Sequence, residues 1–337
     1  MSKAIFMNAL KRKGRDVPAS GPGTSIVSIE LMDYIGVTFP EAHIDSEKMA
    51  RLAEAGHTVY SFDVVMPLFS VWHESAALGC PVDWGKKNLM PDCRRHIWKD
   101  DTDIKIPSDF LNKPGCKVPL EAIKMLKERL GNEAAICGKV FGPWTLGYHV
   151  FGVQEFLVNT LLKPDMIKRA MEKLKQVTVT FANAQIEAGA DCILVGDHAT
   201  RDLCSPKAYR DFLKDIHSEL VDKIPRPLIL HICGDTSDRI SIISETGIPC
   251  FHWDTKLGDP KKTRTLAGEK MSLMGGINNP NTLRKGTKNQ IKEAIVKNIN
   301  AGIDIIAPEC AVPLDTPMNN LKIIGEFVKK YRSEKLT

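Results

Sequence analysis

Three residues with soft donor atoms lie where apolar, strand-like runs end: His231 and Cys233 in the run 228–235, and Cys310 in the run 307–313. Imidazole and thiolate donors suit zinc, and three protein ligands leave a fourth coordination position for chemistry. Residues i and i+2 of a strand share one face, about 6 to 7 Å apart, so His231 and Cys233 can reach one ion. Packed core residues are the alternative interpretation, since free cysteines are commonly buried.

Short apolar runs alternate with amphipathic segments along most of the chain. The runs span 17–21, 57–65, 134–142, 191–197, 227–234, 250–254, 272–278 and 304–308, and the segments 46–55, 119–130, 164–188, 206–222, 290–301 and 316–330. This alternation is typical of a mainly parallel sheet covered by helices. About eight such units predict an α/β fold of the (β/α)₈ TIM barrel type. An open doubly wound sheet is the alternative, but no G-x-G-x-x-G follows an early strand.

A barrel of this kind would bring the candidate ligands together. His231 and Cys233 close the predicted fifth strand, Asp254 closes the sixth, and Cys310 closes the eighth. The carboxyl ends of the strands in this fold share one mouth, where active sites sit. The sequence therefore predicts one metal centre shared by segments that are far apart in the chain.

Two segments depart from the alternation. Residues 69–115 contain tryptophans, prolines and a charged stretch, which predicts an insertion over one barrel end within a single domain spanning residues 1–337. The first fifteen residues carry five basic side chains and no acid, as a transit peptide would. An apolar face formed by Phe6, Ala9 and Leu10 favours an N-terminal helix instead.

Composition excludes several functional classes. The chain has 337 residues, 43% of them hydrophobic and 26% charged, as expected for a globular protein. Without an apolar run of about 18 residues we expect no membrane span. The net charge of +5 comes from dispersed basic residues, so we expect no nucleic-acid partner. Nine cysteines without tight spacing predict a reduced protein, with the cytoplasm as its default location.

Several motifs resemble the uroporphyrinogen decarboxylase superfamily and, within it, the zinc-dependent methylcobamide:coenzyme M methyltransferases of methylotrophic methanogens and their bacterial relatives. The resemblance covers nearly the whole chain. It is carried by Pro40–His43, Gly142-Pro143, Thr145-Leu146, Glu187–Asp191, Leu230–Gly234, Gly302–Asp304 and Ala307–Cys310.

This resemblance implies a function and a set of ligands. The protein would move a methyl group from a methylated corrinoid protein to a zinc-activated thiol, coenzyme M. His231, Cys233 and Cys310 would bind zinc, with Asp254 as a displaceable fourth ligand and catalytic residue. A helix cap or an ion-pair partner is the alternative role for Asp254.

Three further residues near the predicted strand ends are candidates for cofactor binding. Gly142 and Asp197 lie where predicted strands end, and Arg201 follows the fourth strand. We expect these three residues to contribute to binding of the methylcobamide.

Departures from the family pattern leave the acceptor open. Met66 stands where relatives carry an arginine, His198 where they tend to have proline, and Gly276 where they commonly have asparagine. Arg201 and Lys256 could bind an anionic acceptor in place of that arginine, or be ordinary surface charges. Tetrahydrofolate is therefore an alternative acceptor. A carboxy-lyase activity is less favoured, because the arginine-rich N-terminal motif of the decarboxylases is missing.

Overall fold

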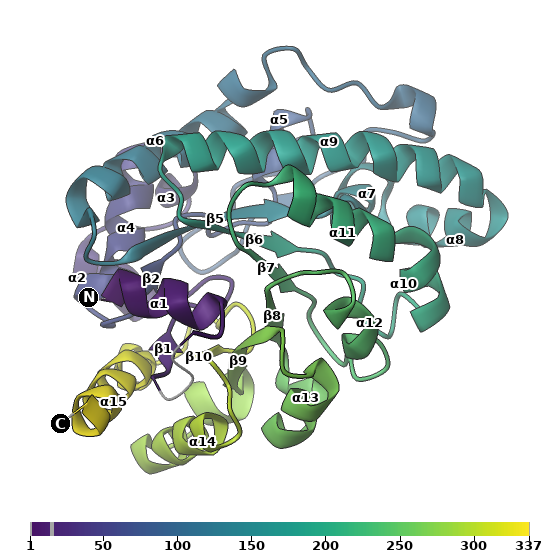
Figure 1. The fold of residues 1–337 in the computed structure, drawn as a ribbon. Helices are drawn as coiled ribbons and strands as arrows, with labels where there is room; N and C mark the ends of the chain where they lie inside the picture. The colour runs from purple at the N-terminus through teal and green to yellow at the C-terminus, as the bar shows by residue number, and fades with distance from the viewer. Residues whose placement is uncertain (1, 14–16, 337) are drawn as a thin grey trace.

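Eight parallel strands surround a central core in the computed structural model, which describes residues 2–13 and 17–336 (Figure 1). The strands are β1 (Ala19–Ser20), β2 (Val64–Val65), β5 (Ala135–Phe141), β6 (Cys192–Gly196), β7 (Leu228–His231), β8 (Cys250–Trp253), β9 (Ser272–Ile277) and β10 (Ile305–Pro308). Their spatial order is β1-β10-β9-β8-β7-β6-β5-β2, and every pair is parallel. The predicted (β/α)₈ barrel is confirmed.

One backbone hydrogen bond joins the two ends of this strand order. The N–H of Asp63, just before β2, donates to the carbonyl oxygen of Ser20 in β1 at 3.1 Å. The Asp63 carboxylate also accepts from Ser20 N at 2.8 Å and from Arg332 Nη2 at 2.9 Å. Asp63 and Arg332 are both buried, so residues from the first and the last part of the chain close the seam.

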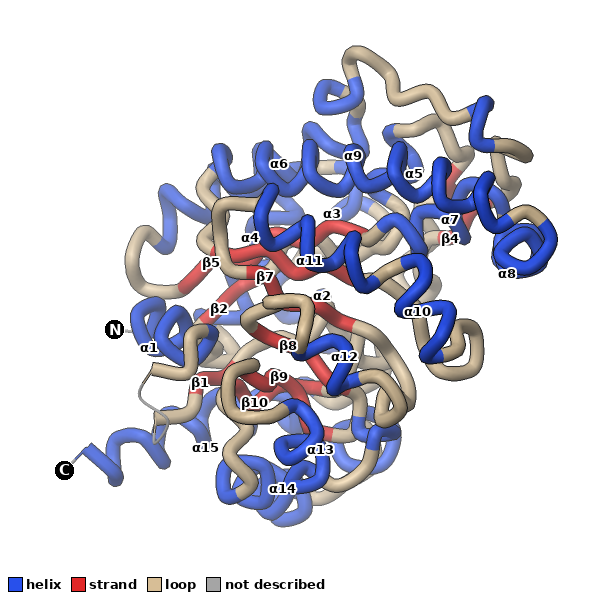
Figure 2. The backbone as a smooth tube through the Cα atoms, turned by 45° about the vertical axis from the view of Figure 1, so that its right-hand side comes forward, coloured by secondary structure: helices blue, strands red, loops and turns tan. Residues whose placement is uncertain are grey.

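Helices cover the outside of the barrel (Figure 2). They are α2 (Ile29–Ile35), α3 (Glu41–Ile44), α4 (Ser46–Thr58), α5 (His73–Ala77), α6 (Pro114–Leu130), α7 (Pro143–Phe151), α8 (Val153–Leu162), α9 (Pro164–Ala188), α10 (Pro206–Phe212), α11 (Lys214–Lys223), α12 (Ile240–Ser244), α13 (Pro260–Ala267), α14 (Lys288–Asn300) and α15 (Met318–Leu336). No helix in the described part of the chain is both long and apolar enough to cross a membrane.

Alternate residues of the strands fill the barrel interior, as the twofold repeat of a strand requires. Helix α1 (Ser2–Leu10) lies at the amino-terminal ends of the strands, where Phe6 and Leu10 join the interior cluster that includes Ala135 and Cys250. This plug closes one end of the barrel, so chemistry is left to the opposite, carboxyl-terminal end. The predicted N-terminal helix is confirmed, although residues 14–16 lie outside the described part.

The region of the second strand differs from the sequence-based prediction. The run 57–65 was expected to be a strand, but its first two residues complete α4 and only Val64–Val65 pair with β5. Backbone hydrogen bonds from Tyr60 and Phe62 to the end of α4 form a turn here, and the His57 imidazole also bonds the Phe62 carbonyl through Nδ1 at 2.7 Å.

The segment between β2 and α6 contains α5, a hairpin of β3 (Val82–Asp83) with β4 (Asp92–Cys93), and two short 3₁₀ turns. Its first part meets the barrel mouth, because Glu74 of α5 accepts from the backbone N–H of Phe141 at 2.7 Å. Its later part extends along α9, where Asp101 pairs with Arg169 at 2.9 Å. A role of this segment as an insertion over the barrel end stays a prediction.

Candidate metal centre

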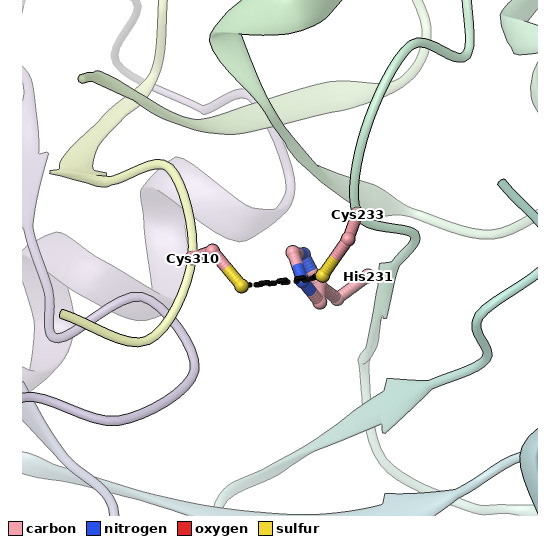
Figure 3. A group of neighbouring side chains, drawn as sticks. All are labelled: His231, Cys233 and Cys310. Carbon is pink, nitrogen blue, oxygen red and sulfur yellow. Dashed lines mark hydrogen bonds between the residues drawn. The ribbon is translucent and has the colours of Figure 1, made fainter. Parts of the chain in front are cut away.

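Three side chains converge beyond the carboxyl ends of β7 and β10 (Figure 3). His231 Nε2 lies 2.9 Å from Cys233 Sγ and 3.6 Å from Cys310 Sγ, and the two sulfur atoms are 3.2 Å apart. His231 is buried while both thiols are partly exposed. The structure thus brings Cys310 to Cys233 and His231, from which it is 77 and 79 positions apart in sequence.

The donor set and its spacing fit zinc. Tetrahedral bonds of about 2.3 Å to sulfur and 2.0–2.1 Å to nitrogen separate two sulfurs by about 3.8 Å and sulfur from nitrogen by about 3.6 Å. The Cys310–His231 distance already equals the latter value, and the other two are shorter by roughly 0.6 to 0.7 Å. Small outward rotations of the thiols would accommodate an ion.

The far side of His231 is held so that Nε2 faces the thiols. Its Nδ1 lies 3.2 Å from the carbonyl oxygen of His252, which fixes the tautomer that carries the proton on Nδ1. The His252 ring packs against it with centroids 4.5 Å apart and bonds the Pro308 carbonyl through Nε2 at 2.8 Å. Burial lowers the pKa of His252 to about 3, so this neighbour adds no positive charge to the site.

The pKa values of the two thiols are shifted in opposite directions. A hydrogen bond from Cys233 holds the pKa of Cys310 well below its usual range, and the same bond raises that of Cys233. Burial raises the pKa of Cys233 further, while contact with His231 lowers that of Cys310. The pair therefore presents one sulfur as a thiolate, the form that binds metal ions.

Asp254 positions the loop that carries Cys233. Its carboxylate accepts from the backbone N–H of Gly234 at 2.8 Å and from that of Lys256 at 2.9 Å, and it caps the turn Thr255–Leu257. Among the described residues, the group whose donor atoms lie within 4.8 Å of one another comprises the His and the two Cys, without Asp254. The structure shows Asp254 as the cap of the turn Thr255–Leu257. Ligation of a metal ion by Asp254 stays a prediction.

A second carboxylate, which sequence reasoning did not single out, anchors the loop of Cys310. Buried Glu309 accepts from Asn279 N at 2.9 Å and from Asn278 Nδ2 at 3.1 Å. Asn279 Nδ2 in turn donates to the carbonyl oxygen of Cys310 at 3.2 Å. The only local signal was the position of Glu309 directly before a candidate ligand.

Gly142 and Asp197 pack against each other at the start of α7. Asp197 is fully buried; it accepts from Thr145 N at 2.8 Å and contacts His217 Nε2 at 3.1 Å. A Cβ on Gly142 would lie 2.2 Å from Asp197 Oδ2, so only glycine fits there. These contacts position α7 at the barrel mouth. Binding of a cofactor by either residue stays a prediction.

The remaining predicted residues lie around the rim. Arg201 is exposed and pairs with Asp235 at 3.0 Å, which ties the loop after β6 to the loop after β7. Lys256 is exposed as well, whereas Met66 joins the barrel interior. The His198 ring packs edge-on against Phe141 at the mouth, 6.1 Å between centroids.

The comparisons with known proteins agree with this geometry. The family model of uroporphyrinogen decarboxylase (URO-D) matches residues 1–331. The chain is 31% identical over 324 residues, 96% of each protein, to the methylcobamide:CoM methyltransferase MtaA of Methanosarcina barkeri. It is 31% identical over 335 residues, 98% of each protein, to the methylcobamide:CoM methyltransferase MtbA of Methanosarcina acetivorans. A solved structure described as a methyltransferase from Methanosarcina mazei covers 100% of this chain and 99% of its own, with a TM-score of 0.94 and 31% identity.

The chain therefore belongs to the uroporphyrinogen decarboxylase family. Within that family its full-length similarity is to methyltransferases, in sequence and in structure, and it is an enzyme of that group. The resemblance seen in the sequence motifs is confirmed.

Proposed function

We propose that this protein transfers a methyl group from a methylated corrinoid protein to the thiol of coenzyme M, 2-mercaptoethanesulfonate. The convergence of His231 Nε2 with the Sγ atoms of Cys233 and Cys310 carries the proposal, since it forms an open site for a thiol-activating ion. The names of the relatives MtaA and MtbA specify coenzyme M and support this acceptor. They lend no support to tetrahydrofolate.

The residues of the chain have separate roles in this reaction. His231, Cys233 and Cys310 would hold zinc. As a Lewis acid, the ion would lower the pKa of an acceptor thiol so that the thiol loses its proton near neutral pH. The His252 carbonyl orients His231, and Asp254 holds the Cys233 loop through the N–H of Gly234. Burial of these supporting groups keeps the donor atoms aimed at the mouth, where acceptor and methyl donor would meet.

The transfer balances without an external oxidant or reductant. The acceptor thiol releases its proton to solvent, and its sulfur forms a bond to the methyl carbon. The cobalt–carbon bond of the methyl-Co(III) corrinoid breaks with both electrons left on cobalt, which gives Co(I). The corrinoid performs the difficult bond cleavage, while the barrel aligns donor and acceptor.

The test is thiol-dependent demethylation of methylcobalamin by purified, zinc-reconstituted protein, followed by the loss of its absorption spectrum. We expect turnover with coenzyme M, none without a thiol, and none in the Cys310→Ser variant. Cys93→Ser, which alters a free cysteine of the β3–β4 hairpin outside the cluster of candidate ligands, is the matched control and should retain activity. Full activity of metal-free protein would contradict the proposal, as would carbon dioxide release from a porphyrinogen without methyl transfer.

A further inference from the structure

A lysine points into the barrel from the middle of β5. Ala135 and Cys137 of this strand belong to the interior cluster, and Lys139 continues the same alternation. Only 3% of its surface is exposed. Sequence reasoning missed it, although a lysine within a run of otherwise apolar residues at an inward position was a usable signal.

The ammonium of Lys139 has few partners. Its Nζ donates to the carbonyl oxygen of Thr24 at 3.2 Å and lies 5.8 Å from the centre of the Phe141 ring. Within the described part of the chain, no carboxylate approaches this nitrogen within ion-pair distance; Glu74, which acts on it from farther away, bonds Phe141 N. A buried ammonium can donate three hydrogen bonds and is costly without an anion, so its site is incomplete in the protein alone.

Two contacts connect this lysine to the loop that carries Cys310, because Lys139 donates to Thr24 and the neighbouring Gly23 packs against that loop. The residue before its partner Thr24 is Gly23, where a Cβ would lie 2.9 Å from the Pro308 carbonyl and 3.3 Å from that of Cys310. The alternative cations, Arg201 and Lys256, are exposed at the rim, and Arg201 is already paired with Asp235.

We propose that Lys139 forms the anion subsite of the acceptor and binds the sulfonate or carboxylate at the end of the substrate opposite its thiol. The thiol would face Cys233 and Cys310 while the acidic group at its other end takes the free N–H donors of Lys139. An ammonium buried in a dry interior binds such a group through charge-assisted hydrogen bonds. This inference rests on the proposed function, because it assigns the two ends of the same acceptor.

Binding of two ligands without a free thiol tests the subsite separately from turnover. Isothermal titration calorimetry would compare 2-(methylthio)ethanesulfonate with its neutral counterpart 2-(methylthio)ethanol. We expect wild-type protein to bind the sulfonate roughly 10- to 100-fold more tightly, the range for a hydrogen bond to a charged group. Lys139→Met should erase this preference, Lys139→Arg should retain most of it, and Lys207→Met, on exposed α10, should leave it unchanged.

The outcomes separate the two proposals. Equal preference in wild-type and Lys139→Met proteins, with both folded by circular dichroism, would overturn the anion subsite. A wild-type protein that binds both ligands equally would overturn it too, without reliance on any variant. A charge preference that depends on Lys139, together with no methyl transfer to any thiol, would instead overturn the proposed function and leave the subsite standing.

Discussion

His231 Nδ1 lies 3.2 Å from the carbonyl oxygen of His252, one strand away in the barrel. This contact leaves Nε2 as the free donor atom, 2.9 Å from Cys233 Sγ. A backbone carbonyl cannot be removed by a side-chain substitution, so the orientation of the imidazole is built into the pairing of β7 with β8. The metal centre is thus supported by the sheet itself.

Removal of one sulfur should release zinc. We expect the wild-type protein to bind about one zinc ion per chain and Cys310→Ala to lower its affinity by more than about 100-fold, the upper limit for loss of a mere supporting partner. Competition with a chromophoric chelator would measure this. The Cys93→Ser control should bind zinc as the wild type does; equal affinity in all three proteins would refute the assignment of Cys310.

Asp254→Ala should weaken zinc binding through the Cys233 loop. The backbone N–H groups of Gly234 and Lys256 lose their acceptor, so we expect a 10- to 100-fold loss of zinc affinity. Asp254→Asn keeps one acceptor oxygen and should lie between the wild type and Asp254→Ala. X-ray absorption of zinc-loaded protein tests direct ligation: identical spectra for wild type and Asp254→Asn would favour the positioning role alone.

Binding of the sulfonate ligand should weaken at alkaline pH. Burial lowers the pKa of Lys139 to about 8, while Glu74, Cys310 and Cys137 oppose that shift. The ammonium is charged below this pKa and an anion stabilises it, so affinity should fall up to about tenfold per pH unit above 8. Calorimetry across pH 6 to 10 measures this, and Lys139→Met should show no such decline.

A neighbouring carboxylate needs its own control in that experiment. Burial raises the pKa of Glu74 to about 7, so its ionisation adds a negative charge near Lys139 as the pH passes neutrality. Glu74→Gln removes this contribution and should leave only the decline above pH 8. A decline near pH 7 that vanishes in Glu74→Gln, with none above 8, would contradict the role given to Lys139.

The barrel seam should depend on the Asp63–Arg332 ion pair. Arg332→Met leaves the Asp63 carboxylate buried with Ser20 as its remaining partner among the described residues, and we expect a loss of about 3 to 5 kcal/mol in the free energy of unfolding. Adding Asp63→Asn to Arg332→Met should restore part of this loss, because no uncompensated charge remains. Urea unfolding measures both, and a change below about 1 kcal/mol in Arg332→Met would be contrary to this view of the seam.

Gly142→Ala should destabilise the protein through a clash with Asp197. The added methyl group would lie 2.2 Å from Oδ2, and overpacking of this kind costs about 1 to 3 kcal/mol. Gly56→Ala in α4 is the control, since its Cβ would meet side chains at ordinary distances of 3.6 and 3.9 Å. There we expect a gain of up to about 1 kcal/mol from helix propensity, by the same unfolding measurement. Equal effects at both glycines would argue against a specific clash.

Local pattern determined the elements and the ligand pair. The predicted helix 164–188 coincides with α9, and the run 134–142 contains β5. Burial of one face gives apolar residues a regular spacing that can be recognised in the sequence. The spacing of His231 and Cys233 likewise follows from strand geometry alone. The turn between α4 and β2, which depends on backbone and side-chain hydrogen bonds around His57, could not be predicted from such a period.

Only the tertiary structure decided which distant groups share a charge or a hydrogen bond. The distances that join Cys310 to Cys233, Asp254 to Gly234 and Lys139 to Thr24 arise from strands that pair around a closed sheet. Asp63 and Arg332 are 269 residues apart and meet at its seam. Such contacts depend on the register of the strands and on side-chain rotamers. The local spacing of apolar residues does not determine either. Sequence therefore identified the chemistry of the donors, and the closed barrel determined what each of them faces.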